Sequence, residues 1–175
     1  YSSANGYTNG TLCIEEGATL TGKVTGKALH DVIRAYEATI TDMTCADEVS
    51  DWYAYDCVIE NSEFLACNKH IYNSYVSNSV FYDSVQICGG TLKDVTIVSH
   101  TGYPATFSGI YKDRFGLSHS SPIKLQGSLT LKTEQLTFDG VIIQANGNDV
   151  ILDLTEKNTS HAAAMVADKF VNSEL

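Results

Sequence analysis

The stretch YNSYVSNSVFYDS, residues 72–84, repeats a small polar pair every five residues. The pairs are Asn73-Ser74, Asn78-Ser79 and Asp83-Ser84. Each pair follows an apolar residue by two positions, and these apolar residues are Ile71, Val76 and Phe81. A unit of this length holds one short strand and one bend. We therefore expect each unit to point one apolar side chain inward and then to turn a corner.

The same spacing continues on both sides of this stretch. Apolar residues separated by five or six positions are Ile59, Leu65, Ile71, Val76, Phe81, Ile87, Leu92 and Ile97. Two places after each stands a small and usually polar residue, namely Asn61, Cys67, Asn73, Asn78, Asp83, Gly89, Asp94 and Ser99. A helix would space apolar residues by three and four, and a long half-buried strand by two, so neither fits. Asn and Asp tolerate the left-handed backbone conformation of tight corners, while Ser and Gly fit where neighbouring coils crowd together.

A chain that bends this regularly is predicted to stack into rungs, because no single unit can bury its apolar face alone. The fold class expected is all-β, a right-handed parallel β-helix (β-solenoid) with a C-terminal capping α-helix. Three units per turn give rungs of 16 to 17 residues, which would place Ile59 under Val76 and Leu92, and Leu65 under Phe81 and Ile97. Four units per turn give 21 to 22 residues and remain an alternative. Right-handed coiling is favoured because left-handed β-helices keep a strict six-residue spacing, which this chain breaks.

The predicted organisation has three parts. Residues 1–10 form a flexible or capping N-terminal segment, and residues 11–157 form the solenoid, with loop excursions at 45–57 and 99–121. Residues 158–175 read as a helix or tail whose apolar stripe would cover the open edge of the last rung. The chain begins without Met and without a signal-like apolar core, which suggests a mature product or an excised fragment.

Composition excludes several classes of function. The formal net charge of −10 argues against nucleic-acid binding and against adsorption to anionic lipid. No run approaches the roughly 18 apolar residues of a membrane helix, so membrane insertion is not expected. The five cysteines show no CxxC or zinc-site spacing, so no metal and no cofactor is expected. Buried free thiols are predicted, with a Cys45–Cys57 bridge as the alternative.

The Asn/Asp-Ser units of residues 57–98 resemble the irregular repeats of β-solenoid segments in phage tail and tailspike proteins and in bacterial surface proteins. They are more distantly similar to pentapeptide-repeat proteins and bactofilins. Pentapeptide-repeat proteins keep a stricter five-residue rule, and bactofilins have a more continuous run of Gly and Ile/Val rungs. The resemblance implies an architecture, and trimers are common among tail solenoids, so a homo-oligomer is left open. Fold alone does not confer function.

Catalysis would need a cluster of titratable groups. The long loop supplies one such set, consisting of His100, Asp113, Arg114 and His119, in which His and Asp could shuttle a proton and Arg could hold an acidic sugar. A solvated loop with a local Asp-Arg pair is the simpler interpretation. Carboxylates such as Asp83 and Asp94 occupy corner positions, which turn formation explains without catalysis.

Aromatic residues are unusually close together in the first half of the chain, and the binding candidates are Trp52, Tyr53, Tyr55, Tyr72, Tyr75 and Tyr82. Exposed aromatic rings suit sugar stacking or a protein interface. A ladder of tyrosines stacked between rungs is the alternative explanation.

The function expected is a structural and binding module of a phage tail or of a bacterial surface or secreted assembly, located outside the cell or on a virion. Its partner would be a glycan or a protein. The alternative is a polysaccharide lyase or glycoside hydrolase of the β-helix type. An acidic mimic of DNA ranks third, because the 21 acidic residues are scattered along the chain.

Overall fold

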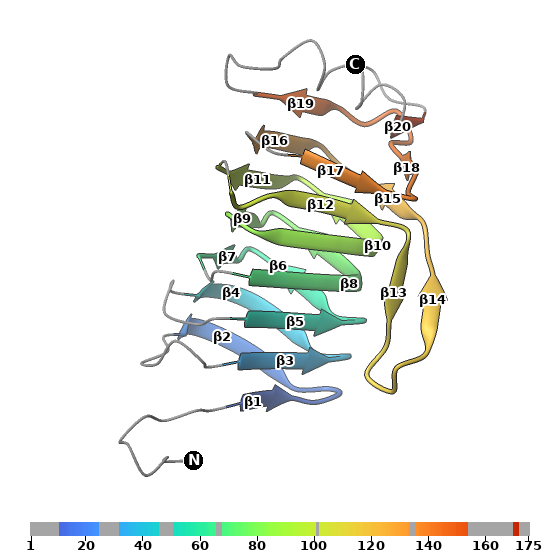
Figure 1. Ribbon diagram of the computed structural model, residues 1–175. Helices are drawn as coiled ribbons and strands as arrows, with labels where there is room; N and C mark the ends of the chain where they lie inside the picture. The colour runs from blue at the N-terminus through green and yellow to red at the C-terminus, as the bar shows by residue number, and fades with distance from the viewer. Residues whose placement is uncertain are drawn as a thin grey trace.

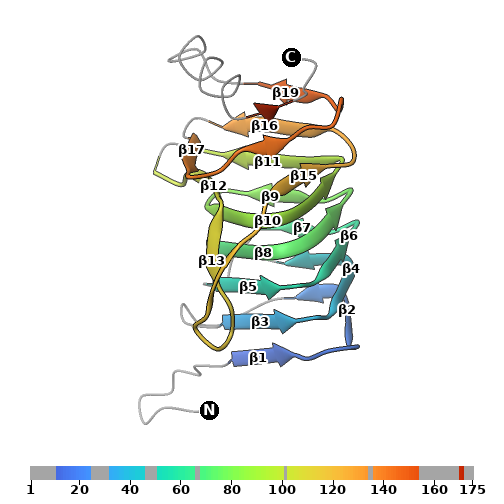
Figure 2. The ribbon, with the colours of Figure 1, turned by 90° about the vertical axis from the view of Figure 1, so that its right-hand side faces the viewer.

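The computed structural model describes residues 11–24, 32–45, 51–65, 68–100, 102–133, 136–153 and 170–171 of the 175-residue chain. These residues form a parallel β-solenoid of about seven turns (Figure 1). With the N-terminus below, the nearer strands run to the right and the farther strands run back to the left as the chain rises, so the coil is right-handed (Figures 1 and 2). The predicted all-β, right-handed parallel β-helix is confirmed.

Each turn contributes to three faces of the rod. Face A contains β1 (Thr11–Ile14), β3 (Val32–Tyr36), β5 (Asp51–Tyr55), the first halves of β8 (Asn68–Ser77) and β10 (Val85–Lys93), β12 (Ala105–Ser108) and β17 (Leu136–Asp139). Face B contains the first halves of β2 (Thr19–Val24) and β4 (Thr39–Cys45), β6 (Val58–Glu60), the second halves of β8 and β10, β15 (Ile123–Leu125), β18 (Ile143–Gln144) and β20 (Phe170–Val171). Face C contains the second halves of β2 and β4, β7 (Glu63–Phe64), β9 (Val80–Tyr82), β11 (Val95–Ser99), β16 (Leu129–Thr133) and β19 (Val150–Leu152).

The apolar residues of the quoted stretch share one interior. Ile71 lies on face A, Val76 on face B and Phe81 on face C, and each is at most 1% exposed. One turn later, Ile87 pairs with Ile71 and Leu92 pairs with Val76. The rung in this region is therefore 16 to 17 residues long, and the three-unit alternative is the correct one.

One interior position was predicted one residue too late. Phe64, not Leu65, pairs with Phe81, and Phe64 is completely buried while Leu65 is only half-buried. The two Phe rings stack with centroids 4.9 Å apart. Neighbouring residues of a strand point to opposite faces, so this shift of one residue exchanges the interior and exterior side chains.

The corners have the left-handed backbone that the Asn and Asp residues predicted. Positive φ angles between 46° and 63° occur at Asn61, Asn73, Asn78, Asp83 and Asp94. The two glycines at the β10 corner also have positive φ, and a Cβ on Gly90 would lie 2.3 Å from a backbone oxygen of the preceding turn. Glycine is required there by conformation and by space.

The serine that follows a corner residue satisfies buried backbone groups. Ser79 Oγ donates to the carbonyl of Ser77 at 2.8 Å and accepts the backbone N–H of Ser62, one turn below, at 3.1 Å. Ser62 Oγ in turn accepts the N–H of Met43 at 3.3 Å. Ser74 binds the N–H of Cys57 in the same way at 3.0 Å. These hydroxyls are buried and tie each corner to the turn below.

Both expected loop excursions contain rung strands. Within 45–57, residues Asp51–Tyr55 form β5 of face A, paired with β3 and β8. Within 99–121, β12 is a rung strand, and the true excursion is the antiparallel hairpin of β13 (Ile110–Lys112) and β14 (Ser118–Ser120). The hairpin leaves at Gly109 and returns at Ser121, whose N–H donates to the Gly109 carbonyl at 3.3 Å.

The predicted C-terminal helix falls largely outside the described residues, as does the N-terminal segment 1–10. Phe170–Val171, the part of that helix that the structure describes, is strand β20 and pairs in parallel with β18. Within the described ranges, no helix has the length and apolar character needed to span a bilayer.

The structure forms no Cys45–Cys57 bridge, and Cys13, Cys57 and Cys88 are free thiols. Cys45, Cys57 and Cys88 are buried and Cys13 is exposed, while Cys67 lies outside the described residues. Burial raises the pKa of Cys45 and of Cys88 to about 11, since a thiolate is poorly solvated in the interior. Cys45 Sγ also accepts the indole N–H of Trp52 at 2.7 Å.

Candidate functional site

A ladder of tyrosines runs up the outside of face A. Tyr36, Tyr55 and Tyr72 occupy one register position on three successive turns. The ring centroids of Tyr36 and Tyr55 are 5.3 Å apart, and those of Tyr55 and Tyr72 are 4.9 Å apart. Parallel strands lie about 4.8 Å apart, so equivalent side chains on adjacent turns meet by construction. The ladder that the sequence left as an alternative is confirmed for these residues.

A second column of side chains lies beside the ladder. Arg34, Tyr53 and His70 share the register position two residues earlier on the same turns. The guanidinium carbon of Arg34 lies 4.9 Å from the centroid of the Tyr53 ring, which stacks on His70 at 4.5 Å. His70 Nδ1 lies 3.2 Å from Gln86 Oε1. This column therefore presents a cation, a phenol, an imidazole and an amide in sequence along the rod.

The β13–β14 hairpin folds down alongside face A (Figures 1 and 2). Tyr111 of β13 stacks on Tyr72 with centroids 5.6 Å apart and an interplanar angle of 10°. His119, its cross-strand partner in β14, stacks on the other side of Tyr111 at 5.3 Å. The hairpin thus adds Tyr111 and His119 to the aromatic contacts of the tyrosine ladder.

Arg114 fastens the tip of the hairpin to the lower turns. Its guanidinium forms two hydrogen bonds with the carboxylate of Glu15, at 3.0 and 3.3 Å. Its guanidinium carbon also lies 3.7 Å from the centroid of the Tyr36 ring. A bidentate ion pair combined with a cation–π contact fixes the orientation of a side chain more strongly than either contact alone. The hairpin is therefore held at its tip as well as at its base.

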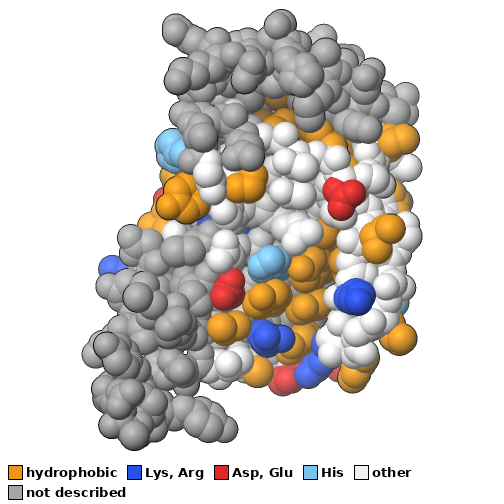
Figure 3. Space-filling model, in the orientation of Figure 1, with side chains coloured by type: hydrophobic (Ala, Val, Ile, Leu, Met, Phe, Trp, Pro, Cys, Tyr) orange, Lys and Arg blue, Asp and Glu red, His pale blue; other side chains and the backbone are white. Residues whose placement is uncertain are grey.

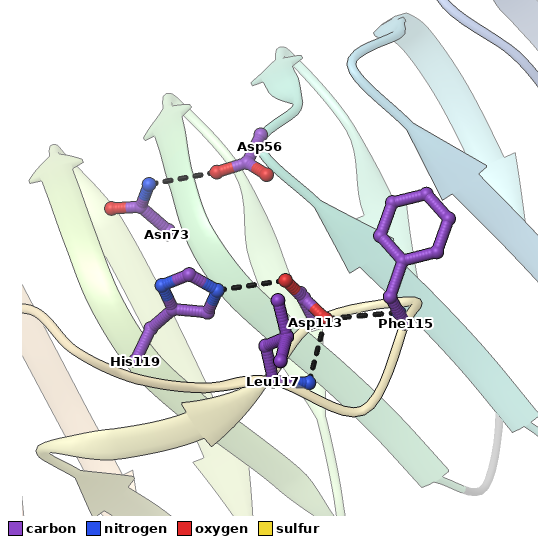
Figure 4. Close-up of polar contacts among 6 residues, drawn as sticks. All are labelled: Asp56, Asn73, Asp113, Phe115, Leu117 and His119. Atoms are coloured by element: carbon purple, nitrogen blue, oxygen red, sulfur yellow. Dashed lines mark hydrogen bonds and ion pairs between the residues drawn. The ribbon is translucent and has the colours of Figure 1, made fainter.

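Asp113 organises the hairpin turn (Figure 4). One carboxylate oxygen accepts the backbone N–H groups of Phe115 and Leu117, each at 2.9 Å, and the other lies 2.8 Å from His119 Nε2. The hydrogen bond with His119 is the main cause that lowers the pKa of Asp113, and the backbone N–H groups lower it further. The Asp113 side chain is therefore an ionised acceptor.

Between the hairpin and face A lies an open cleft of about 620 Å³. Its lining residues are Arg34, Tyr55, Tyr72, Gln86, Ile110, Tyr111, Lys112, Asp113, Arg114, Gly116 and Ser118. In Figure 3 a column of hydrophobic side chains, a class that includes tyrosine, runs up this face with basic side chains beside it. Ligand sites are concave, with a few convergent polar groups, and this cleft has that character.

The cleft keeps its phenols protonated. Burial is the main cause that raises the pKa of Tyr55, Tyr72 and Tyr111 above the usual value for tyrosine. A phenolic hydroxyl with a raised pKa remains a hydrogen-bond donor throughout the neutral range. The site is therefore equipped to donate hydrogen bonds to an oxygen-rich ligand.

The four predicted catalytic residues do not form one cluster. Asp113 and His119 meet in the hairpin, whereas Arg114 pairs with Glu15. His100 follows β11 and pairs with Asp83 of a corner at 2.9 Å. The corner carboxylates Asp83 and Asp94 have positive φ, which agrees with their role in turns.

The six predicted binding residues divide among the interior and all three faces. Trp52 is 0% exposed and points into the core, so it cannot contribute to a binding surface. Tyr53, Tyr55 and Tyr72 lie on face A beside the cleft. Tyr75 lies on face B, paired with Val58, and Tyr82 lies on face C, paired with Val98.

Sequence reasoning missed several members of the site, notably Tyr36, Tyr111, Arg34 and Gln86. Tyr111 belongs to the predicted loop excursion 99–121, but its contact with Tyr72 depends on how the hairpin folds back. Arg34 and Gln86 lie on face A at the register position of Tyr53 and His70. An alignment of the face A strands, one rung above the next, would have found these two residues. Such an alignment brings together outward-facing positions on successive turns, which are 16 or more residues apart in the sequence.

Among the described residues, no group of three His, Cys, Asp or Glu side chains is placed to hold a metal ion. Comparisons with protein-family models, with curated proteins and with solved structures found no match for this chain.

Proposed function

We propose that this chain is a structural and binding module of a phage tail or of a bacterial surface or secreted assembly, exposed outside the cell or on a virion. In this proposal the solenoid acts as a rigid spacer and a glycan is held in the cleft between the hairpin and the tyrosine ladder. The observation that carries the proposal is the stack of Tyr111 on Tyr72, because it joins the excursion to the rod and closes one side of the cleft.

The rod supports this function because its site residues stand on regular strands. Tyr55 and Tyr72 are held by parallel pairing with the turns above and below, and their rings contact other aromatic rings on two sides. Side chains fixed by such packing lose little conformational entropy when a ligand binds. A preformed cleft of this kind favours recognition without large rearrangement.

Binding is favoured over hydrolysis by the acidic groups of the cleft. Glycoside hydrolases use two carboxyl groups across the scissile bond, one of them kept protonated by a raised pKa. The described lining residues contain a single carboxylate, Asp113, and its pKa is lowered. This carboxylate is also occupied by His119 and two backbone N–H groups.

The contact between Asp113 and His119 favours a second candidate, a polysaccharide lyase. A histidine oriented by a carboxylate beside tyrosines and an arginine is a combination that could abstract a proton from a uronic acid. Incubation with acidic polysaccharides, followed by detection of unsaturated products, tests this candidate. Product formation that is lost in His119→Ala and Asp113→Asn would establish it, and no turnover on a broad panel would reject it.

Excision of the hairpin tests the binding proposal. Replacing residues 110–120 by Asn-Gly should leave the solenoid folded, because Gly109 and Ser121 already lie within hydrogen-bond distance. We expect unchanged circular dichroism and cooperative unfolding, together with loss of the signals that the intact chain gives on a glycan array. A matched control, Tyr75→Ser with Tyr82→Ser, removes tyrosines from faces B and C and should retain binding. Array binding that survives hairpin excision would refute the proposed site.

A further inference from the structure

Basic side chains are concentrated at the cleft of an otherwise acidic chain. The chain has 11 Lys and Arg residues against 21 Asp and Glu residues. Arg34, Lys112 and Arg114 all line the cleft, whereas Asp113 is the one acidic residue among its described lining residues. Among the described lining residues, basic groups therefore outnumber acidic ones, in contrast to the whole chain, which favours an anionic group at this place.

Of the four charged side chains that line the cleft in the described part of the chain, two have an ion-pair partner and two do not. Arg114 is neutralised by its bidentate pair with Glu15, and Asp113 is bonded to His119. In the described part of the chain, Arg34 and Lys112 take part in no ion pair. These two cations remain available to a ligand.

Arg34 is the better placed of the two. It is half-buried on β3, where its guanidinium lies against the Tyr53 ring, and Lys112 on β13 is exposed. A hydrogen bond with Tyr36 is the main cause that raises the pKa of Arg34, so its charge is retained. A guanidinium oriented by a stacked ring offers two parallel donors, which match the two oxygens of a carboxylate.

The tyrosine rings beside the cleft are in contact with other aromatic rings. Tyr55 lies between Tyr36 and Tyr72, and Tyr72 lies between Tyr55 and Tyr111. Because these rings are occupied by one another, stacking of a sugar on them is limited. What remains is the ring edge, which carries partial positive charge, and the protonated hydroxyl, although the hydroxyl of Tyr72 already lies 3.2 Å from His70 Nδ1. The ring edge and the hydroxyl both attract oxygen atoms of a ligand, and they attract a negatively charged carboxylate more strongly than a neutral hydroxyl.

The same charges limit the kind of anion. Dense polyanions such as nucleic acids need many phosphate contacts from Lys and Arg. The two available cations among the described lining residues of the cleft, in a chain of net charge −10, do not offer them. A ligand with an isolated carboxylate among hydroxyl groups fits both the two cations and the row of phenols. We infer that the cleft binds a carboxylated saccharide, such as a uronic or sialic acid unit, with its carboxylate against Arg34.

This inference rests on the proposed function. Matched pairs of acidic and neutral sugars test the carboxylate preference separately from glycan binding itself. The probes are sialyllactose against lactose, and short oligogalacturonates against their carboxyl-reduced forms. Dissociation constants are measured by calorimetry at low and at moderate salt. We expect an acidic probe to bind and its neutral partner to bind at least about tenfold more weakly, the weakening expected when a charge-assisted hydrogen bond is lost.

Three variants locate the carboxylate. Arg34→Gln should weaken binding of the acidic probe about tenfold or more, and Lys112→Gln should weaken it by up to about fivefold because its charge is exposed. The control, Lys124→Gln, removes the same charge from an exposed position on face B and should change nothing. Circular dichroism verifies that each variant is folded.

Two results would overturn the inference. Equal binding of acidic and neutral partners, unaffected by Arg34→Gln, would show that the cleft holds a neutral glycan, which leaves the proposed function intact. No binding of any probe would reject the carboxylated saccharide, and the glycan array with the hairpin-excised variant then decides separately whether the cleft binds glycans at all.

Discussion

At the three corners Asn61-Ser62, Asn73-Ser74 and Asn78-Ser79, an Asn-Ser pair divides two tasks between two side chains. The Asn adopts the left-handed backbone that the bend requires, at φ 46° for Asn78. The Ser accepts a backbone N–H of the turn below, which the bend would otherwise leave without a partner. This division explains why the pair recurs as a pair, since either residue alone would leave a strained or an unsatisfied backbone.

Replacement of Ser79 tests this role. Ser79→Ala leaves the buried N–H of Ser62 without its acceptor, so we expect the free energy of unfolding to fall by about 1–3 kcal/mol. Urea denaturation monitored by circular dichroism gives the value. Ser120→Ala, on the exposed strand β14, is the matched control and should change it by less than about 0.5 kcal/mol. Equal effects of the two substitutions would contradict the role assigned to the corner serine.

At the scale of the element, the β13–β14 hairpin is held by polar contacts and one aromatic stack, in contrast to the buried rungs beside it. Ile110, Phe115 and Leu117 are exposed, and Phe115 is 80% exposed. The hairpin therefore gains little from burial and depends on Asp113, Arg114 and Tyr111 for its position. Elements with few buried apolar contacts open more readily than the core.

Asp113→Ala should loosen the hairpin without unfolding the rod. The substitution removes the acceptor of the Phe115 and Leu117 N–H groups, so their hydrogen exchange should accelerate by about five- to tenfold, while β8 amides stay protected. Asp149→Ala, an exposed carboxylate outside the hairpin, is the control. Unchanged exchange at Leu117 would contradict the role of Asp113.

The same contact predicts a dependence on pH. Folding lowers the pKa of Asp113 below its ordinary value of 3.8, so the carboxylate form is the one that the hairpin stabilises. This contribution is complete above pH 3.8 and is lost as the pH falls through the lowered pKa. Amide hydrogen exchange at Leu117 should therefore become faster than its intrinsic dependence on pH predicts only below pH 3.8, where Asp113 begins to take up a proton. Asp113→Ala should abolish this additional acceleration.

For the molecule as a whole, stability is distributed along the stack, because each turn contacts only its neighbours. Central turns have a neighbour on both sides and terminal turns have one. Phe81 is fully buried between Phe64 and Ile97, whereas Phe138 on β17 is partly exposed.

Two phenylalanine substitutions should reveal this gradient. Phe81→Ala is expected to lower the free energy of unfolding by about 3–5 kcal/mol, since it opens a cavity in a closed interior. Phe138→Ala should cost clearly less, because its side chain is already partly solvated. Thermal and urea unfolding of both variants provide the measurement. A larger loss for Phe138→Ala would contradict the gradient.

The repeat predicted the solenoid because corner chemistry and interior spacing agreed over most of the eight units between Ile59 and Ile97. The error at Leu65 arose because Phe64 is also apolar, and hydrophobicity alone does not decide which of two adjacent residues points inward. The error at Trp52 is of the same kind. In β5, Trp52 and Ala54 point inward and Tyr53 and Tyr55 outward, and both sets are apolar enough for the core.

The cleft was harder to predict than the rod. Its tyrosines meet because Tyr36, Tyr55 and Tyr72 share a register position, and the lengths of the intervening segments differ. Tyr111 joins them through an antiparallel hairpin that does not follow the repeat. A periodic pattern predicts only contacts that share its period, and the hairpin contacts do not.

The hairpin begins and ends at two residues that touch, so inserting it costs the stack no change of register: Leu92 still pairs with Leu125 directly above it. Such a corner is a natural grafting point. Evolution could replace the whole hairpin, and so change what the rod binds, without changing the interior residues. For the same reason, foreign peptides could be inserted between Gly109 and Ser121 by design.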